Sequence, residues 1–162
     1  MSVFSTLDHD QQVASLQRLA QSALAQWEGD FVNLELIKYR ENAVFCATRA
    51  DGVRSALRVH RLDYHCEAAL RSELTWMEQL AAGGIGVPQI IRTREGDHLA
   101  NVHSEELAES RHVDMLGWLA GSTLGSAEQG IRADADVGAL FFEAGAVAAR
   151  IHLQSAQWRQ PN

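Results

Sequence analysis

Cysteine and proline are both scarce in this sequence of 162 residues, with two of each. Cys46 and Cys66 are too few for a disulfide framework, which excludes a small secreted scaffold and indicates a reducing compartment. The chain shows no basic segment followed by an apolar one at its start, and no run of about eighteen apolar residues. We therefore expect neither secretion nor contact with a membrane, and we place the protein in the cytoplasm.

Lysine is almost absent as well, since Lys38 is the single lysine among 14 basic residues and the others are arginines. With 21 acidic residues the net charge is −7, which repels a polyanion, so nucleic acid is not an expected partner. A phosphate group bound here would be held by arginine or by backbone N–H groups. The apolar share of 46 % and the charged share of 22 % are those of a globular domain.

Hydrophobic periodicity predicts an α+β fold with an about five-stranded, largely antiparallel sheet and flanking helices. Ser5 with Asp8 resembles a capping box in front of the first helix. A segment at 102–109 is acidic and typical of a surface. The expected elements are a helix over 8–27, strands over 31–39, 42–49 and 54–61, a helix over 64–82, two short strands around 94–97, a strand over 112–119 and a helix over 136–157.

Glu73 interrupts the apolar face of the second predicted helix, where it shares an arc with Leu70, Leu74 and Met77. A carboxylate on such a face needs a cation, because an unpaired buried charge costs several kcal/mol. The best candidate is Arg58, which interrupts the apolar strand just before the helix. This pair fits a structural ion pair as well as a binding site.

The order of these features resembles the amino-terminal lobe of the protein-kinase-like fold, in which a cation on the third strand pairs with a helix glutamate. Four segments are similar to the aminoglycoside phosphotransferase and choline kinase superfamily, and homoserine kinase type II and related small-molecule kinases are the nearest match. These segments are Leu57-Arg58-Val59-His60-Arg61, Ser72-Glu73-Leu74 with Trp76-Met77, Gly86-Val87-Pro88 and Gly117-Trp118-Leu119-Ala120-Gly121.

The resemblance implies a nucleotide-binding lobe with a leading helix over residues 1–121, followed at 122–162 by a linker and the start of a second lobe. It implies transfer of the ATP γ-phosphate, with Mg²⁺, to a hydroxyl of a small molecule such as homoserine, an amino alcohol or an aminoglycoside-like compound. Arg58 would hold the phosphates and Glu73 would orient it. The implied covering turn is Arg40, Glu41 and Asn42, and backbone groups of Gly117, Trp118 and Leu119 would contact adenine.

Three departures from that pattern limit the expected activity. The third-strand cation is Arg58 where many members have lysine, and the covering turn has no glycine. The sequence also contains no His-x-Asp-x-x-x-x-Asn catalytic loop, because His112-x-Asp114 is followed by Leu119 in place of the asparagine and falls in the predicted hinge strand. We therefore expect no catalytic residues in this chain, no turnover by the chain alone and weak ATP binding.

The alternative is a free-standing, non-catalytic protein-binding or regulatory module with the same lobe. In either case the face that would meet a second lobe is expected to be apolar and to support a homodimer. A zinc site is not expected, because the grouping of His60, His65 and Cys66 and that of His98 and His103 lack zinc-ligand spacing.

Overall fold

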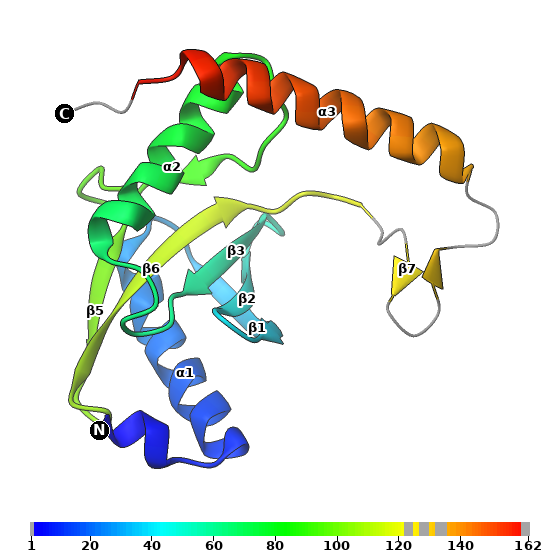
Figure 1. Cartoon of the computed structure of the whole chain (residues 1–162). Coiled ribbons are helices and arrows are strands. Elements are labelled where there is room, and N and C mark those ends of the chain that lie inside the picture. Colours follow the sequence, from blue (N-terminus) through cyan, green and yellow to red (C-terminus); the bar gives the residue numbers. More distant parts are fainter. Residues whose placement is uncertain (1, 122–124, 127–129, 132–135, 160–162) are drawn as a thin grey trace. The chain divides into compact units, whose positions relative to one another are not determined.

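A computed structural model of the protein describes residues 2–121, 125–126, 130–131 and 136–159. It divides into two compact units, Met1–Thr75 with Pro88–Trp118 and Trp76–Val87 with Leu119–Asn162. The elements follow the chain in the order shown in Figure 1. They are η1 (Val3–Thr6), α1 (His9–Ala23), η2 (Leu24–Gln26), β1 (Phe31–Tyr39), β2 (Ala43–Arg49), β3 (Arg54–Val59), α2 (Glu67–Ala82), β4 (Ile90–Ile91), β5 (Ala100–Ser104), β6 (Glu109–Gly117), β7 (Gly125–Ser126), β8 (Gly130–Ile131) and α3 (Val137–Gln157).

The first unit contains a six-stranded sheet in which every pairing is antiparallel. The strand order is β1-β2-β3-β6-β4, and β5 also pairs with β6. In this register Ala43 lies opposite Val59, and Arg58 lies opposite Asp114. The sheet and its helices confirm the α+β class and the antiparallel arrangement expected from the sequence.

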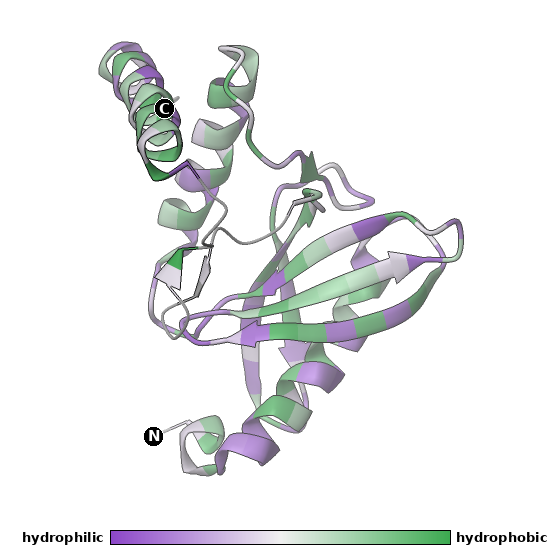
Figure 2. Cartoon of the chain, turned by 90° about the vertical axis from the view of Figure 1, so that its right-hand side faces the viewer, coloured by the Kyte–Doolittle hydropathy of each residue, from purple (hydrophilic) through white to green (hydrophobic). Residues whose placement is uncertain are grey.

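Helix α1 covers one face of this sheet and supplies much of its core (Figure 2). Trp27, which follows η2, is completely buried, and its indole N–H donates a hydrogen bond of 2.8 Å to the carbonyl of Ile91. A buried indole adds a large apolar area to the core, and the hydrogen bond of its N–H fixes the orientation of the ring. The buried apolar residues of this core are Leu16, Leu19, Ala20, Ala23, Leu24, Trp27, Ala43, Phe45, Ala47, Leu57, Val59, Ala100, Val102, Val113 and Met115.

The cap of α1 differs from the expected one. The capping box consists of Asp8, whose carboxylate accepts from the backbone N–H of Gln11, and Gln11, whose side chain accepts from the backbone N–H of Asp8. Ser5 lies in η1 instead, where its hydroxyl donates to the carbonyl of Ser2. A serine three residues before an aspartate resembles this motif in sequence, but the N-cap position is set by where the helical backbone begins.

Other boundaries shift for local reasons. The segment expected to be an acidic surface contains most of β5, whose Ala100 and Val102 are buried on the core side while Asn101 and His103 are exposed. This alternation is the period of two of a half-buried strand, and the acidic residues gather only in the turn that follows it. Helix α2 begins at Glu67, after a turn in which Asp63 has a positive φ of 58°.

Strand β1 forms the outer edge of the sheet. Its register with β2 shifts twice, between Phe31 and Asn33 and again between Leu36 and Lys38. Each shift is a bulge or irregularity that bends and twists the strand.

The second unit contains the end of α2, the β7–β8 hairpin and α3. The Asp136 carboxylate caps α3 by accepting from the backbone N–H of Ala139. The indole of Trp76 donates to the side-chain oxygen of Gln154 at 3.3 Å. Within the described segments, no helix combines the length and the apolar character needed to cross a membrane.

Candidate functional site

Arg58 is the centre of a charged cluster on the sheet face away from α1. Its neighbours on β3, Leu57 and Val59, point into the core, and a strand alternates its side chains, so Arg58 projects from the opposite face. An arginine at this position needs a partner for its charge, because its strand is largely apolar and an unpaired buried charge is costly.

Asp114 on β6 is the main partner of Arg58. The two residues lie directly opposite in the register of β3 and β6. Arg58 Nε donates to Asp114 Oδ1 at 2.7 Å and Arg58 Nη2 donates to Asp114 Oδ2 at 2.8 Å. Asp114 is 0 % exposed, so this bidentate pair is a buried one with a geometry set by the sheet itself.

Glu73 and His60 complete the cluster. Arg58 Nη1 donates to Glu73 Oε1 at 2.9 Å, which confirms the ion pair expected from the sequence. The Glu73 side chain is 42 % exposed, so it lies at the edge of the cluster and not in the core as its helical position suggested. His60 is buried, and its Nε2 lies 2.7 Å from Asp114 Oδ2. Because an ionised carboxylate only accepts hydrogen bonds, that nitrogen carries the proton.

Hydrogen bonds and burial have opposite effects on the pKa values of Asp114 and Arg58. Burial alone raises the pKa of Asp114, but the hydrogen bonds from His60 and Arg58 and the charge of Arg58 outweigh it, so the pKa of Asp114 lies below its usual range. Burial likewise lowers the pKa of Arg58, and Asp114 followed by Glu73 more than reverse this, so the pKa of Arg58 is raised. Both groups are therefore charged at neutral pH.

The cluster retains capacity for a ligand. Arg58 uses three of the five N–H groups of a guanidinium on Asp114 and Glu73, so two N–H groups remain. One arginine faces two carboxylates, so the cluster has a net negative charge if His60 is not counted. Such a site attracts a cation and accepts an anion best when a cation accompanies it.

The remaining predicted site residues lie elsewhere in the fold. Arg40, Glu41 and Asn42 form the β1–β2 turn, and Arg40 and Glu41 line a cavity on the α1 face. Among the described side chains, the hydrogen bonds and ion pairs of Arg58 go to Asp114 and Glu73 and not to this turn.

The predicted adenine-contacting residues follow β6. The backbone N–H of Gly117 donates to the carbonyl of Gln89 at 2.7 Å, and Trp118 stacks under the guanidinium of Arg54 at 5.1 Å. Leu119 is exposed and belongs to the second unit.

The pairing of Asp114 with Arg58 was not predicted from the sequence, in which His112-x-Asp114 is only a false match to a catalytic loop. A usable pattern was present, because Asp114 is the single charge within the apolar run Val113 to Leu116, as Arg58 is within the run Ala56 to Val59. Two lone opposite charges in apolar strands indicate a cross-strand pair. Of the described residues, no three of the His, Cys, Asp and Glu side chains are grouped so that they could hold a metal ion.

Neither models of protein families nor curated protein sequences match this chain. Solved structures do. A microcompartment-associated aminopropanol kinase is similar over 89 % of this chain with 26 % sequence identity and a TM-score of 0.72. An amicoumacin kinase, solved in complex with AMP-PNP, Ca²⁺ and Ami, is similar over 96 % of this chain with 17 % identity and a TM-score of 0.76.

These matches confirm the resemblance to aminoglycoside-phosphotransferase-like kinases and the fold of a kinase-like amino-terminal lobe. The chain spans less than half the length of either kinase, 42 % of the first and 45 % of the second. The likeness therefore concerns the lobe alone.

Proposed function

We propose that this chain is the ATP-binding lobe of a phosphotransferase that moves the ATP γ-phosphate to a hydroxyl of a small molecule such as homoserine, an amino alcohol or an aminoglycoside-like compound. The observation that carries the proposal is Arg58, a third-strand cation paired with a helix glutamate within a lobe whose solved neighbours are small-molecule kinases. In kinases a third-strand cation paired in this way contacts the α- and β-phosphates.

The charge of the cluster fits a nucleotide that arrives with its metal. Arg58 offers two N–H groups, while Glu73 and Asp114 together exceed its charge. A bare triphosphate would be repelled, whereas Mg²⁺ bound to it would offset that repulsion. The two free cysteines, Cys46 and Cys66, suit a reducing compartment such as the cytoplasm, which agrees with an ATP-dependent role.

We further propose that residues 1–121 form the nucleotide-binding lobe and that 122–162 lead into a second lobe, although part of this second range lies outside the described residues. Phosphoryl transfer needs a base near the acceptor hydroxyl and ligands for the metal. The sequence given has no His-x-Asp-x-x-x-x-Asn segment to supply them. These residues by themselves should bind nucleotide weakly and transfer no phosphoryl group.

Nuclear magnetic resonance tests the nucleotide site. Adding Mg-AMP-PNP to the labelled chain should shift the amide resonances of Arg58, Glu73 and residues 117–119, with a Kd of about 1 mM or weaker because only one lobe is present. Removing Mg²⁺ with a chelator should weaken the binding further.

Arg58→Lys should reduce the shifts, because lysine cannot bind Asp114 in a bidentate way and still reach the ligand. Arg18→Lys, an exposed arginine on α1 that is paired with Glu106, is the matched control and should behave like the unchanged protein. The proposal is wrong if about 10 mM nucleotide shifts none of these resonances. Micromolar binding would contradict the expected need for a second lobe.

A second candidate function, a non-catalytic module that binds a second copy of the chain, is supported by α3. The helix has no buried residue, and it exposes Phe141, Phe142 and Leu153, with Phe142 at 75 %. Its largely hydrophobic colouring is visible in Figure 2. Apolar patches of this kind seldom stay uncovered on a monomer, and two identical helices can cover each other about a two-fold axis.

Light scattering at micromolar concentration tests this association. We expect a particle larger than 17.8 kDa whose mass falls on dilution, and we expect Phe142→Glu to return it to the monomer mass. Glu143→Gln on the same helix is the control and should leave the association in place. A monomer mass at every concentration would contradict the homodimer.

A further inference from the structure

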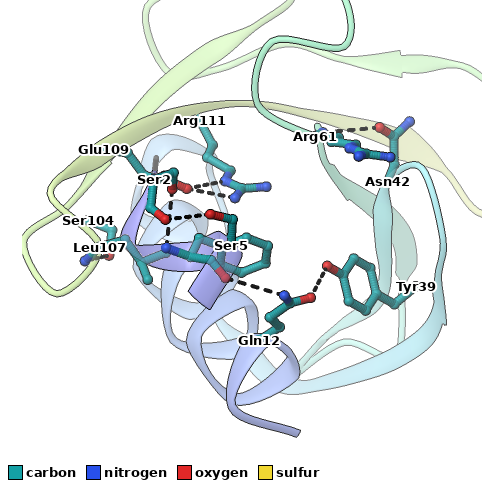
Figure 3. A network of polar contacts seen from close by, with 11 residues as sticks. Ser2, Ser5, Gln12, Tyr39, Asn42, Arg61, Ser104, Leu107, Glu109 and Arg111 are labelled. Carbon is teal, nitrogen blue, oxygen red and sulfur yellow. Dashed lines mark hydrogen bonds and ion pairs between the residues drawn. The ribbon is translucent and has the colours of Figure 1, made fainter. Parts of the chain in front are cut away.

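A cavity of about 440 Å³ opens on the α1 face of the sheet, inside the first unit. Its walls come from η1, the start of α1, the end of β1 with the turn after it, the start of β2, the end of β3 with the segment after it, and β6. The size lies within the usual range for sites that bind small molecules. Figure 3 shows several of its polar lining residues, among them Gln12, Tyr39 and Arg111.

This cavity is separate from the charged cluster. Ala43 and Val59, which line it, are partners across β2 and β3 and point into the α1 core. Arg58 alternates with Val59 on the same strand and projects from the other face. A ligand in the cavity therefore contacts neither Arg58 nor Glu73.

Arg111 provides a buried polar wall. Its side chain is only 4 % exposed, and its Nε and Nη2 donate to Glu109 Oε1 at 2.8 and 2.6 Å. The guanidinium lies over the ring of Phe4 at 4.2 Å, and the hydroxyl of Ser2 donates to the second oxygen of Glu109. Nη1 makes no hydrogen bond with any described residue. The surroundings thus fix this arginine and leave one nitrogen available to a ligand.

The rim carries both signs of charge. Arg61 and Asp63 lie on the segment after β3, and Arg40 and Glu41 lie on the β1–β2 turn. None of the four forms an ion pair with another side chain in the described part of the chain. The two rim segments are joined because the backbone N–H of Arg61 donates to Asn42 Oδ1 at 3.3 Å. The rim is therefore preformed, with donors and acceptors both unused.

These charges select the class of ligand. A simple anion would satisfy the arginines but would meet Asp63 and Glu41, and a polyanion such as ATP would be repelled by both. A molecule with a carboxylate and an ammonium group satisfies both sets without changing the net charge. Phe4, Leu16 and Val59 offer an apolar wall for the rest of the molecule. We propose that this cavity binds a free amino acid with an apolar side chain.

In this arrangement the ligand carboxylate is held by Arg61 and by Nη1 of Arg111, and its ammonium group by Asp63. The apolar side chain of the ligand contacts Phe4 and Leu16.

Titration with L-leucine, followed by nuclear magnetic resonance on the whole chain, tests the proposal. Leucine should shift the amide resonances of Ser5, Tyr39 and Leu62. 4-Methylpentanoate lacks the ammonium group and leucinol lacks the carboxylate, so each should bind at least about tenfold more weakly, the usual effect of losing a charged hydrogen bond.

Two rim variants assign the contacts. Asp63→Asn should weaken leucine binding about tenfold and leave 4-methylpentanoate unchanged, and asparagine tolerates the positive φ of this position. Arg61→Gln should weaken leucine and 4-methylpentanoate but not leucinol. The matched controls Glu95→Gln and Arg54→Gln change exposed residues of the first unit that do not line the cavity, and they should have no effect.

Two results would overturn the proposal. One is the absence of shifts at these amides with about 10 mM leucine. The other is binding of 4-methylpentanoate and leucinol as tightly as leucine itself.

Discussion

Replacing Arg58 with methionine is expected to lower the free energy of unfolding by about 3 to 5 kcal/mol, measured by urea denaturation. The reason is that the carboxylate of Asp114, the partner of Arg58, remains buried after the substitution. Asp114 is wholly buried, and of its hydrogen bonds with described side chains only the one from His60 remains without Arg58. Removing one member of a buried ion pair leaves a charge that neither water nor protein compensates.

Two further variants separate this cause from simple loss of packing. Arg54→Met, at the exposed end of the same strand, removes only a stacking contact with Trp118 and should cost less than about 1 kcal/mol. The double variant Arg58→Met with Asp114→Leu removes both buried charges and should recover most of the lost stability. If the double variant is no more stable than Arg58→Met alone, the stranded carboxylate is not the cause.

Asp114→Asn is expected to destabilise the protein by about 2 to 3 kcal/mol near pH 7, and the loss should shrink as the pH falls. The pKa of Asp114 is lowered in the folded protein, so an unfolded chain binds a proton on this group more readily than a folded one. The ionised form therefore stabilises the fold above the ordinary pKa of 3.8, and that contribution disappears as the pH falls from this value through the folded pKa.

Denaturation by urea at about pH 7, 5, 4 and 3 measures this difference between the protein and its variant. The two stability curves should converge toward acid. Glu106→Gln is a suitable control, because Glu106 is paired with Arg18 in an exposed position and contributes little. A difference between Asp114→Asn and the unchanged protein that is constant across this pH range would show that the carboxylate acts by shape and not by charge.

The order of elements could be predicted because it depends on local patterns. The periodicity of three and four residues in α1 and the period of two in β2 and β3 are properties of adjacent residues. The edges of elements were less predictable, as the cap at Asp8 shows, since both Ser5 and Asp8 are residue types that cap helices. Strand β5 is the second of the two short strands expected around 94–97, but its continuation through Val102 to Ser104 was not predicted, because an acidic turn dominates the composition of that segment.

Only one of the two ion pairs of Arg58 at the candidate site could be predicted from the sequence. Arg58 and Glu73 are fifteen residues apart and belong to consecutive elements, so their pairing follows from the tendency of such elements to pack together. Asp114 is separated from Arg58 by 56 residues, and only the register of β3 and β6 brings them face to face. The cavity beside the β1–β2 turn is lined by residues of six helices and strands, and no local pattern indicates it.

The two irregular steps in β1 have a consequence for how copies of this protein meet. A regular outer strand presents an unbroken row of N–H and C=O groups that a neighbouring molecule can extend into a shared sheet, which is the first step toward fibrils. In β1 that row is interrupted on both sides of Leu34, and the exposed Lys38 adds charge near its end. The sheet therefore stops at β1, and a second copy that meets this edge has to join it through side chains instead of through the backbone.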